Sequence, residues 1–393
     1  MNPLSLLGRS SNLFDLDIKN AKDLDSIIKK SSFLVLGGAG SIGQSVTKEI
    51  FSRNPKKLHI VDISENNLAE LVRDIRSSLG YISGDFKTYA IDIGSIEYDY
   101  FIKSDGKYDY VLNLSALKHV RSEKDKYTLM RMIDVNIFNT IKTIKQSISN
   151  NTKKYFCVST DKATNPVNMM GASKRIMEIF LNKYSDKINI STARFANVAF
   201  SDGSLMHSFN QRFNKCQPIV APDDIQRYFI TEKESGELCL LSCIYGENND
   251  IFFPKLLDKL HLIKFSDIAI NFLDSKGYKP FICNSEEEAR NFKINSNDLT
   301  WPCLFTQSDT SGEKDFEEFF SLDEQINFEK FNGLGIVKNN FKDTDEILIS
   351  FKKNINKMRN MGSWRKEDIL KSFQILLPNF SHIETGKYLD SKM

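Results

Sequence analysis

The sequence predicts an α/β protein with a doubly wound parallel sheet and a smaller C-terminal lobe. Over residues 31–200, short apolar runs alternate with amphipathic segments of helix length, which is the pattern of parallel strands joined by crossover helices. The runs carry few polar residues on either face, as expected for strands that helices cover on both sides. Glycines directly follow the first run, where such a sheet turns into its first helix.

Six apolar runs define the expected strands. SFLVLGG ends in glycines, KLHIVD and KTYAID each end in an aspartate, and YDYVLNLSA, KKYFCVST and INISTARFANV are rich in residues that favour strands. These strands are expected at residues 32–38, 57–62, 87–92, 108–116, 153–160 and 188–198. Amphipathic spacing predicts helices at residues 42–53, 64–79, 127–149 and 171–185.

The chain divides into four segments by this pattern. They are an N-terminal arm (1–30), the main sheet domain (31–200), a second lobe interleaved with the sheet (201–330) and a C-terminal extension without an assigned role (331–393). Residues 285–315 are polar, and we expect them to be rich in loops.

Composition excludes several classes of protein. The chain has 393 residues and a formal net charge of +2, so no broad basic field favours nucleic acid or anionic lipid. Six scattered cysteines form no C-x-x-C pair and no cluster with histidine, which indicates no metal site and favours buried thiols in a reducing compartment. No apolar run reaches the roughly 18 residues of a membrane span, and the N-terminus lacks a signal-peptide pattern. The protein is therefore expected to be cytoplasmic.

The segment GGAGSIG predicts a Rossmann-like dinucleotide site. Its glycines allow a tight turn and a close approach to a pyrophosphate, which the N–H groups of the following helix would bind. Asp62 closes the second strand, where a carboxylate accepts hydrogen bonds from ribose hydroxyls and repels a 2′-phosphate, so NAD is favoured over NADP. The alternative is a sheet that uses these turns for packing alone. The expected cofactor contacts are Gly37, Gly40, Ser41, Ile42, Gly43, Asp62, Asp92, Ile93, Ser115, Ala116 and Lys174.

The stretch STDKATNPVNMMGASK, residues 159–174, carries the expected chemistry. Thr160, Asp161 and Lys162 lie at the carboxyl end of a strand, where open α/β sheets bind their ligands. Lys174 follows Met170 by one helical turn, a spacing that resembles the Tyr-x-x-x-Lys motif of the short-chain dehydrogenase/reductases. A methionine thioether has no proton to exchange, so either the chain is an inactive relative or other groups do the acid/base work of that tyrosine.

Five ordered segments resemble one branch of that superfamily. STDKATNPVNMMGASKR, NLSALKHVRSE, ARFANVAFSDGS, DDIQRYFIT and SGEKDFEEFF are similar to segments of the nucleotide-sugar 4,6-dehydratases. They most resemble the UDP-N-acetylglucosamine 4,6-dehydratases of bacterial polysaccharide and glycan biosynthesis, and the resemblance covers residues 31–330. Many membrane-anchored members of that family also have methionine in place of the tyrosine, but this sequence has no expected membrane span.

The resemblance implies an internal redox cycle on a nucleotide sugar. Hydride leaves carbon 4 for NAD⁺, water is lost across carbons 5 and 6, and hydride returns to carbon 6. Asp161 would protonate the leaving 6-hydroxyl, Lys162 would remove the carbon-5 proton, and Thr160 would hydrogen-bond the 4-oxygen. The 4-hydroxyl proton would leave through Thr160 towards Asp161 or Lys174, which also holds the nicotinamide ribose. A lysine base needs a pKa far below the usual value of about 10.4.

Substrate binding is expected from residues of both the main domain and the second lobe. The candidates are Arg227 and Asn197 for the pyrophosphate, Ser204 for backbone contacts, Lys118 and His119 for the hexose, and Glu313 as a residue that closes over the nucleotide. Arg227 as a surface charge and His119 as a structural histidine are the alternatives. The helices at 127–149 and 171–185 pair between subunits in this superfamily, which implies a homo-oligomer.

Two other functions remain open. A nucleotide-sugar 4-epimerase of the same fold is disfavoured because Met170 replaces the tyrosine that epimerases retain. A non-catalytic NAD-binding scaffold is disfavoured because it would not need the Asp161, Lys162 and Lys174 set. UDP-N-acetylglucosamine is the expected substrate and a GDP-linked sugar is the alternative, for products such as bacillosamine or legionaminic acid. Stereochemistry at carbon 5 stays open, although the methionine favours retention.

Overall fold

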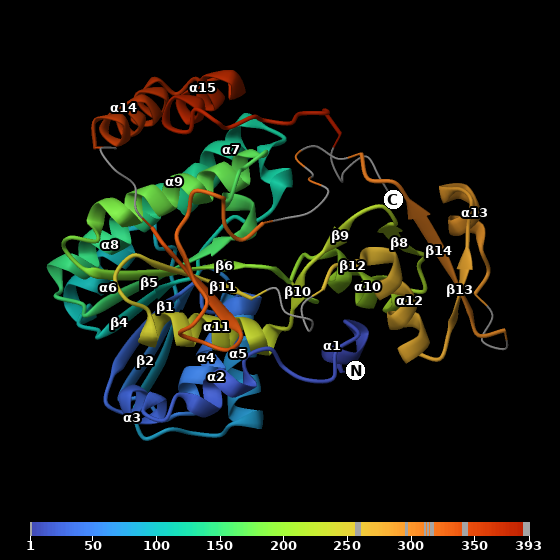
Figure 1. Ribbon diagram of the computed structural model, residues 1–393, viewed down its shortest axis with the longest axis horizontal. Coiled ribbons are helices and arrows are strands. Elements are labelled where there is room, and N and C mark those ends of the chain that lie inside the picture. The colour runs from blue at the N-terminus through green and yellow to red at the C-terminus, as the bar shows by residue number, and fades with distance from the viewer. Residues whose placement is uncertain are drawn as a thin grey trace.

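The structure is a computed structural model that describes residues 2–255, 261–294, 298–309, 312, 314, 318–339 and 345–387. Within these residues the largest element is a nine-stranded sheet (Figure 1). Its spatial order is β15 (Ile326–Asn327), β16 (Leu334–Lys338), β11 (Asp250–Pro254), β6 (Asn189–Phe195), β5 (Lys154–Thr160), β4 (Tyr110–Asn113), β1 (Ser32–Leu36), β2 (Lys57–Asp62) and β3 (Asp85–Ala90). All neighbours from β3 to β11 are parallel, and β16 and β15 continue the edge antiparallel. This order confirms the predicted doubly wound, Rossmann-like sheet.

Helices cover both faces of this sheet because the strands present apolar side chains on both faces. Phe33 and Val35 of β1 face one core, whereas Leu34 and Leu36 face the other. The first core contains α4 (Ser41–Phe51), α5 (Glu65–Ser78) and α11 (Glu232–Tyr245). The second contains α6 (Ile96–Asp105), α7 (Lys126–Ile133), α8 (Asn139–Ser149) and α9 (Met169–Tyr184).

Four local features of the structure differ from the sequence-based predictions. Helix α6 was not predicted, and β3 begins at Asp85 rather than at residue 87. The single helix expected at 127–149 is interrupted between α7 and α8 by the π-helical turn η2 (Asp134–Phe138). The prediction of loops over 285–315 was wrong, because α13 (Glu286–Asn291) and the buried strand β14 (Thr300–Thr306) form there.

The second lobe has its own small core. Strands β13 (Lys279–Ile282), β14 and β8 (Ile219–Pro222) make a parallel sheet, which packs with α10 (Leu205–Asn214) and α12 (Phe265–Ser275). Two short pairs, β7 (Asn197–Val198) with β10 (Phe229–Ile230) and β9 (Gln226–Arg227) with β12 (Ile263–Lys264), lie between this lobe and the main sheet (Figure 1). The division of the chain into a cofactor domain and a substrate lobe stays a functional prediction.

The N-terminal arm connects both cores. It forms α1 (Pro3–Leu6), α2 (Asp15–Asn20) and α3 (Leu24–Lys29). Leu7 is buried in the core of the second lobe, and Phe14 is buried in the first core of the main sheet. Between them, both terminal nitrogens of Arg9 lie 2.7 Å from the buried carboxylate of Glu234 in α11.

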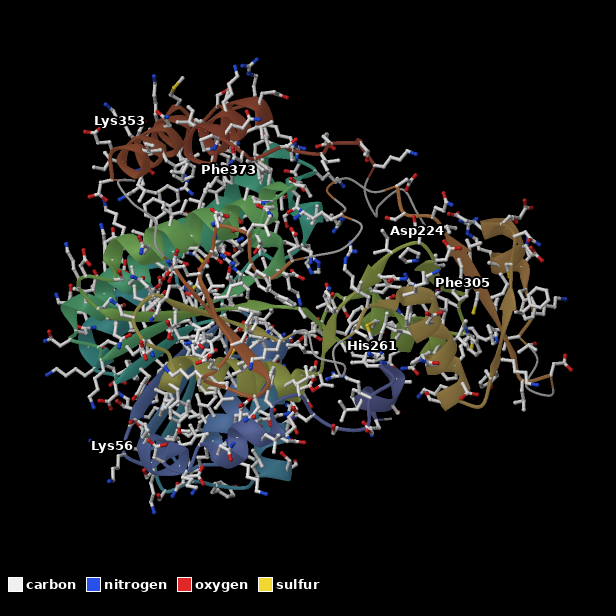
Figure 2. The ribbon with its side chains drawn as sticks, in the orientation of Figure 1. Lys56, Asp224, His261, Phe305, Lys353 and Phe373 are labelled. Atoms are coloured by element: carbon white, nitrogen blue, oxygen red, sulfur yellow. The ribbon has the colours of Figure 1, made fainter. Side chains whose placement is uncertain are left out.

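The C-terminal extension completes the sheet with β16 and then adds a helix pair. Helices α14 (Asp345–Met361) and α15 (Lys366–Leu376) lie over α9 as an additional layer (Figure 1). Phe373 of α15 lies between the helix pair and the main domain (Figure 2). Phe351 of α14 contacts both Phe373 and Phe180 of α9. The extension therefore covers part of the surface for which subunit pairing was expected, and the homo-oligomer stays a prediction.

Two further expectations concern the whole chain. No helix formed by the described residues has both the length and the apolar character needed to span a bilayer. Five of the six cysteines are buried as expected, but Cys216 is exposed, because it follows α10 in a turn with a positive φ of 52°.

Candidate active site

The loop after β5 places a buried acid next to a lysine. Asp161 is only 1% exposed, and its Oδ1 accepts hydrogen bonds from the Thr160 hydroxyl at 2.8 Å and the Lys162 backbone N–H at 2.8 Å. The Lys162 Nζ lies 3.2 Å from the same oxygen. The other oxygen, Oδ2, is buried and has no hydrogen-bond partner among the described residues. The three residues that were predicted to act together therefore lie together at the end of β5.

The first turn of α9 packs directly against this loop. A side chain on Gly171 would clash with the carbonyl oxygen of Lys162. Met170 is 4% exposed and belongs to the second core. The Lys174 Nζ donates to the Val158 carbonyl at 3.0 Å, and burial lowers the pKa of Lys174. Lys174 was expected to hold the nicotinamide ribose, and in the structure its nitrogen is directed to the β5 backbone.

The glycine loop between β1 and α4 fits a bound pyrophosphate. Gly37 has a φ of 72°, and a Cβ there would lie 2.7 Å from the Ser115 backbone nitrogen. A Cβ on Gly43 would clash with the Gly37 carbonyl. Residue 43 must therefore be glycine for α4 to pack this closely against the turn. At Gly40 a Cβ would meet no atom closer than 3.7 Å, so the loop backbone is open to a ligand there. The first N–H groups of α4, from Ser41 onward, begin at this point.

Asp62 ends β2, whereas Asp92 lies two residues beyond the end of β3 rather than at its end as predicted, and the two aspartates have different partners. The Asp62 carboxylate accepts from the Ala39 and Ser64 backbone N–H groups, both at 2.9 Å, and so it fixes the glycine loop. Each of its oxygens retains capacity for a further hydrogen bond, as ribose binding would require. Asp92 accepts from Arg131 at 2.9 Å, and the neighbouring Ile93 is buried.

The turn at residues 201–204 brings another group of candidates to the glycine loop. The Asp202 backbone N–H donates to the Ser41 hydroxyl at 2.8 Å. Ser204 caps α10 by accepting from the His207 N–H at 3.1 Å. A Cβ on the intervening Gly203 would lie 3.0 Å from the ring of His119.

Lys118 and His119 lie beside this turn. Both side chains reach solvent, yet the surrounding protein partly desolvates them and lowers the pKa of each. The charges of Asp202 and Glu232 oppose this effect at Lys118. The loop that contains Ala116, Lys118 and His119 therefore connects the expected cofactor end to the second lobe.

The remaining substrate candidates are more dispersed. Asn197, in β7, donates its backbone N–H to the Tyr228 carbonyl at 3.0 Å, beside Arg227 of β9. Arg227 is 4% exposed and donates to the Gln226 carbonyl at 2.8 Å, so it is not the surface charge of the alternative interpretation. Glu313 lies outside the described residues. No group of three acidic, histidine or cysteine side chains within the described ranges could hold a metal ion.

Sequence reasoning missed two buried polar residues that support the site. Asn136, in the π-helical turn, bonds both backbone groups of Leu117 and the Ser173 hydroxyl of α9 at 2.9–3.0 Å. Glu123 accepts from the Met169 N–H at the start of α9. The π turn directs Asn136 to both partners, as such turns often do at functional sites. Glu123 was within the quoted NLSALKHVRSE segment, but its role depends on contacts that the segment does not reveal.

This fold and this strand-end cluster define the class of nucleotide-binding enzymes with the short-chain dehydrogenase/reductase fold. The chain belongs to the family described as "Polysaccharide biosynthesis protein", which matches residues 33–338.

Curated relatives of the chain include several nucleotide-sugar enzymes. It is 30% identical over 267 residues to the "Uncharacterized membrane protein MJ1061" of Methanocaldococcus jannaschii, covering 66% of this chain and 77% of that protein. It is 24% identical to the inverting UDP-N-acetylglucosamine 4,6-dehydratase of Campylobacter jejuni, over 77% of this chain and 85% of that enzyme. It is 30% identical to a UDP-glucose 4-epimerase of Rickettsia bellii, over 57% of this chain and 66% of that enzyme. The chain spans 45% of the length of CapD, a capsular polysaccharide protein of Staphylococcus aureus.

Solved structures confirm the fold. Pen from Bacillus thuringiensis superposes with a TM-score of 0.65 at 22% identity, over 80% of this chain and 89% of that one. The dTDP-glucose 4,6-dehydratase DesIV from Streptomyces venezuelae, solved with NAD bound, has a TM-score of 0.52 at 15% identity, over 70% and 88%.

Proposed function

We propose that this protein removes water from a nucleotide-linked N-acetylhexosamine, with UDP-N-acetylglucosamine as the first candidate, to give the 4-keto-6-deoxy sugar. The observation that carries the proposal is the pair formed by Asp161 and Lys162 at the end of β5. A dehydratase needs an acid for the leaving 6-hydroxyl and a base for the carbon-5 proton. The C. jejuni relative is a dehydratase of this class and the R. bellii relative is a 4-epimerase, so the choice between the two reactions rests on this pair of residues.

The two oxygens of Asp161 support different tasks. Oδ1 is engaged by the Thr160 hydroxyl, the Lys162 N–H and the Lys162 Nζ. Oδ2 has no partner among the described residues, so it is the oxygen that can deliver a proton to a ligand. A buried polar oxygen without a partner is costly in a resting protein, and a substrate hydroxyl would satisfy it.

The resting and the reactive forms of the Asp161–Lys162 pair differ in the position of one proton. The ion pair and the neutral acid–amine pair hold the same number of protons, and they differ by a transfer along the 3.2 Å contact between Lys162 Nζ and Asp161 Oδ1. In the neutral form, Asp161 is the acid that protonates the leaving 6-hydroxyl and Lys162 is the base that removes the carbon-5 proton. Loss of water leaves Asp161 ionised and Lys162 protonated. Lys162 then returns its proton to carbon 5 when carbon 6 is reduced, and the proton released by the 4-hydroxyl restores the acid form of Asp161.

The remaining residues would bind and orient the cofactor and the sugar nucleotide. NAD supplies the hydride acceptor, and the glycine loop with Ser41 and Asp62 would hold it. Thr160 would hydrogen-bond the sugar 4-oxygen and pass its proton towards Asp161. Met170 contributes an apolar wall, which excludes water from the carbon that loses its proton. Lys118 and His119 would contact the hexose, and Arg227 and Asn197 the pyrophosphate.

The test is turnover of the purified chain with NAD and a panel of UDP- and GDP-linked hexosamines, followed by mass spectrometry. The expected product lacks one water, whereas a 4-epimerase would give a product of unchanged mass. Asp161→Asn and Lys162→Ala should each abolish dehydration and still bind NAD, because neither residue touches the glycine loop. Met170→Ala should retain most activity. The exposed Lys187 provides a matched control, since Lys187→Ala should leave turnover unchanged.

Near-normal turnover of Lys162→Ala would remove this residue from the chemistry. Absence of both a dehydrated and a 4-epimeric product across the whole panel, with NAD bound, would favour the scaffold instead.

A further inference from the structure

The segment that follows α15 runs from the helix pair towards the second lobe (Figure 1). Phe380 is buried in the second core beneath α15, which fixes the start of the segment. Three residues later, the Ile383 backbone N–H donates to the Val167 carbonyl at 2.9 Å, in the loop between the catalytic pair and α9. The Thr385 hydroxyl then donates to the Asp309 carbonyl of the second lobe at 3.1 Å. The C-terminal segment therefore contacts the main domain, the catalytic loop and the second lobe in turn.

His382 is the residue of this segment that reaches deepest. Its Nε2 lies 3.0 Å from the Oε2 of Glu123, and both side chains are nearly inaccessible to solvent. A carboxylate oxygen can only accept, so the histidine N–H is the donor. The same Oε2 accepts the Met169 backbone N–H at 2.8 Å. Glu123 thus binds the C-terminal segment and the first residue of α9 through one oxygen.

The physical role of this carboxylate follows from the helix it caps. Met169 is the first residue of α9, and its N–H has no acceptor within the helix. A negative charge at this end is stabilised by the helix dipole, but a buried carboxylate needs further donors to offset its lost hydration. His382 supplies the second donor to Oε2, while Oε1 has no partner among the described residues. Without His382 the carboxylate would keep a single described donor.

The start of α9 is mechanically coupled to the catalytic pair. Met170 follows Met169 directly, and Gly171 packs on the Lys162 carbonyl so closely that a Cβ would clash. Asn168 caps the helix by accepting the Gly171 N–H at 2.7 Å. A shift of this turn therefore moves the backbone of Lys162, whose nitrogen must stay within reach of the substrate.

We propose that His382 is a positioning residue: by donating to Glu123 it holds the first turn of α9, and through it Lys162, in the reactive geometry. The C-terminal extension is then part of the active site rather than an appendage. Only the activity readout of this proposal rests on the proposed dehydration.

The test compares His382→Phe, which keeps a ring but removes the donor, with His382→Gln, whose amide N–H can replace Nε2. His382→Phe should lower kcat on the order of tenfold with little change in KM, because a displaced catalytic group costs the transition state more than binding. His382→Gln should restore kcat to within about twofold. Phe373→Leu is the matched control, since it weakens the packing of α15 without touching Glu123. It should lower the melting temperature and leave kcat unchanged.

Hydrogen exchange separates this proposal from the function. In His382→Phe, peptides covering residues 162–171 should exchange faster, while NAD affinity and peptides from β1 to α4 stay unchanged. This readout needs no substrate, so it tests the coupling even if the chain dehydrates none of the sugars. Unchanged exchange at 162–171, or equal kcat losses in His382→Gln and His382→Phe, would overturn the positioning role. A kcat loss in Phe373→Leu equal to that of His382→Phe would assign the effect to stability instead.

Discussion

Replacing Glu324 by glutamine should lower the free energy of unfolding by about 3 kcal/mol at pH 7. Glu324 belongs to a buried charge cluster behind the catalytic strand. Arg194 is fully buried and donates to both oxygens of Glu324 and of Glu178 at 2.8–3.0 Å. Glu178 also accepts from the Ser159 hydroxyl at 2.7 Å, directly before Thr160. The cluster therefore joins β5, β6 and α9 to the segment between β14 and β15.

The magnitude follows from the pKa of Glu324. Burial acts to raise this pKa, but the hydrogen bonds and charge of Arg194, and then the charge of Arg175, lower it from 4.5 to about 2. At 1.36 kcal/mol per pH unit, the difference corresponds to about 3 kcal/mol. Because the folded-state pKa is lowered, this stability is fully present above pH 4.5 and is lost as the pH falls towards 2. About 2 kcal/mol should remain at pH 3.5.

The assay is urea unfolding followed by far-ultraviolet circular dichroism at pH 7 and pH 3.5. The difference in the free energy of unfolding between the wild-type protein and Glu324→Gln should shrink from about 3 kcal/mol at pH 7 to about 2 kcal/mol at pH 3.5. The exposed Glu329 provides the control, and Glu329→Gln should stay within about 0.5 kcal/mol of the wild type at both. If Glu324→Gln behaves like Glu329→Gln, or if its cost does not depend on pH, the carboxylate does not stabilise the cluster as argued.

Two more predictions concern the cofactor loop and the thiols. Gly43→Ala should weaken NAD binding, measured by calorimetry, by about tenfold or more. The reason is that its Cβ would clash with the Gly37 carbonyl and displace the start of α4. Unchanged affinity would mean that the loop does not bind the pyrophosphate. A thiol reagent should modify Cys216 in the native protein well before the five buried cysteines, and Cys216→Ser should remove this fast reaction; a fast reaction that persists in the variant would contradict the buried positions of the others.

The sheet could be predicted because its strands are continuous apolar runs with clear boundaries. β1, β2 and β5 bury nearly every residue, so the runs themselves locate them. α6 was missed because its ten residues are rich in aromatic and charged side chains and have little amphipathic periodicity. β14 was missed because it contains Pro302 and is flanked by polar residues, which are signals against a strand.

The site was predictable to the extent that it is local in sequence. Thr160, Asp161 and Lys162 meet because they follow one strand, so locating β5 was enough to group them. The Glu123–His382 pair joins residues 259 positions apart, and no local pattern specifies such a contact. The C-terminal extension could be assigned no role from sequence for the same reason, because its helices are defined by what they cover.

Met170 and Lys174 occupy the positions of the tyrosine and lysine in the Tyr-x-x-x-Lys motif. Their environment explains why Asp161 and Lys162, at the end of β5, would carry out the acid/base chemistry instead. Met170 lies in the second core and offers no proton, and the Lys174 nitrogen donates to the Val158 backbone rather than towards position 170. Burial lowers the pKa of Lys174, because it disfavours the charged form of the amine. Under the proposed reaction, the loss of the tyrosine is therefore compatible with catalysis, because the acid and the base lie side by side on one loop that α9 and the C-terminal segment hold in place.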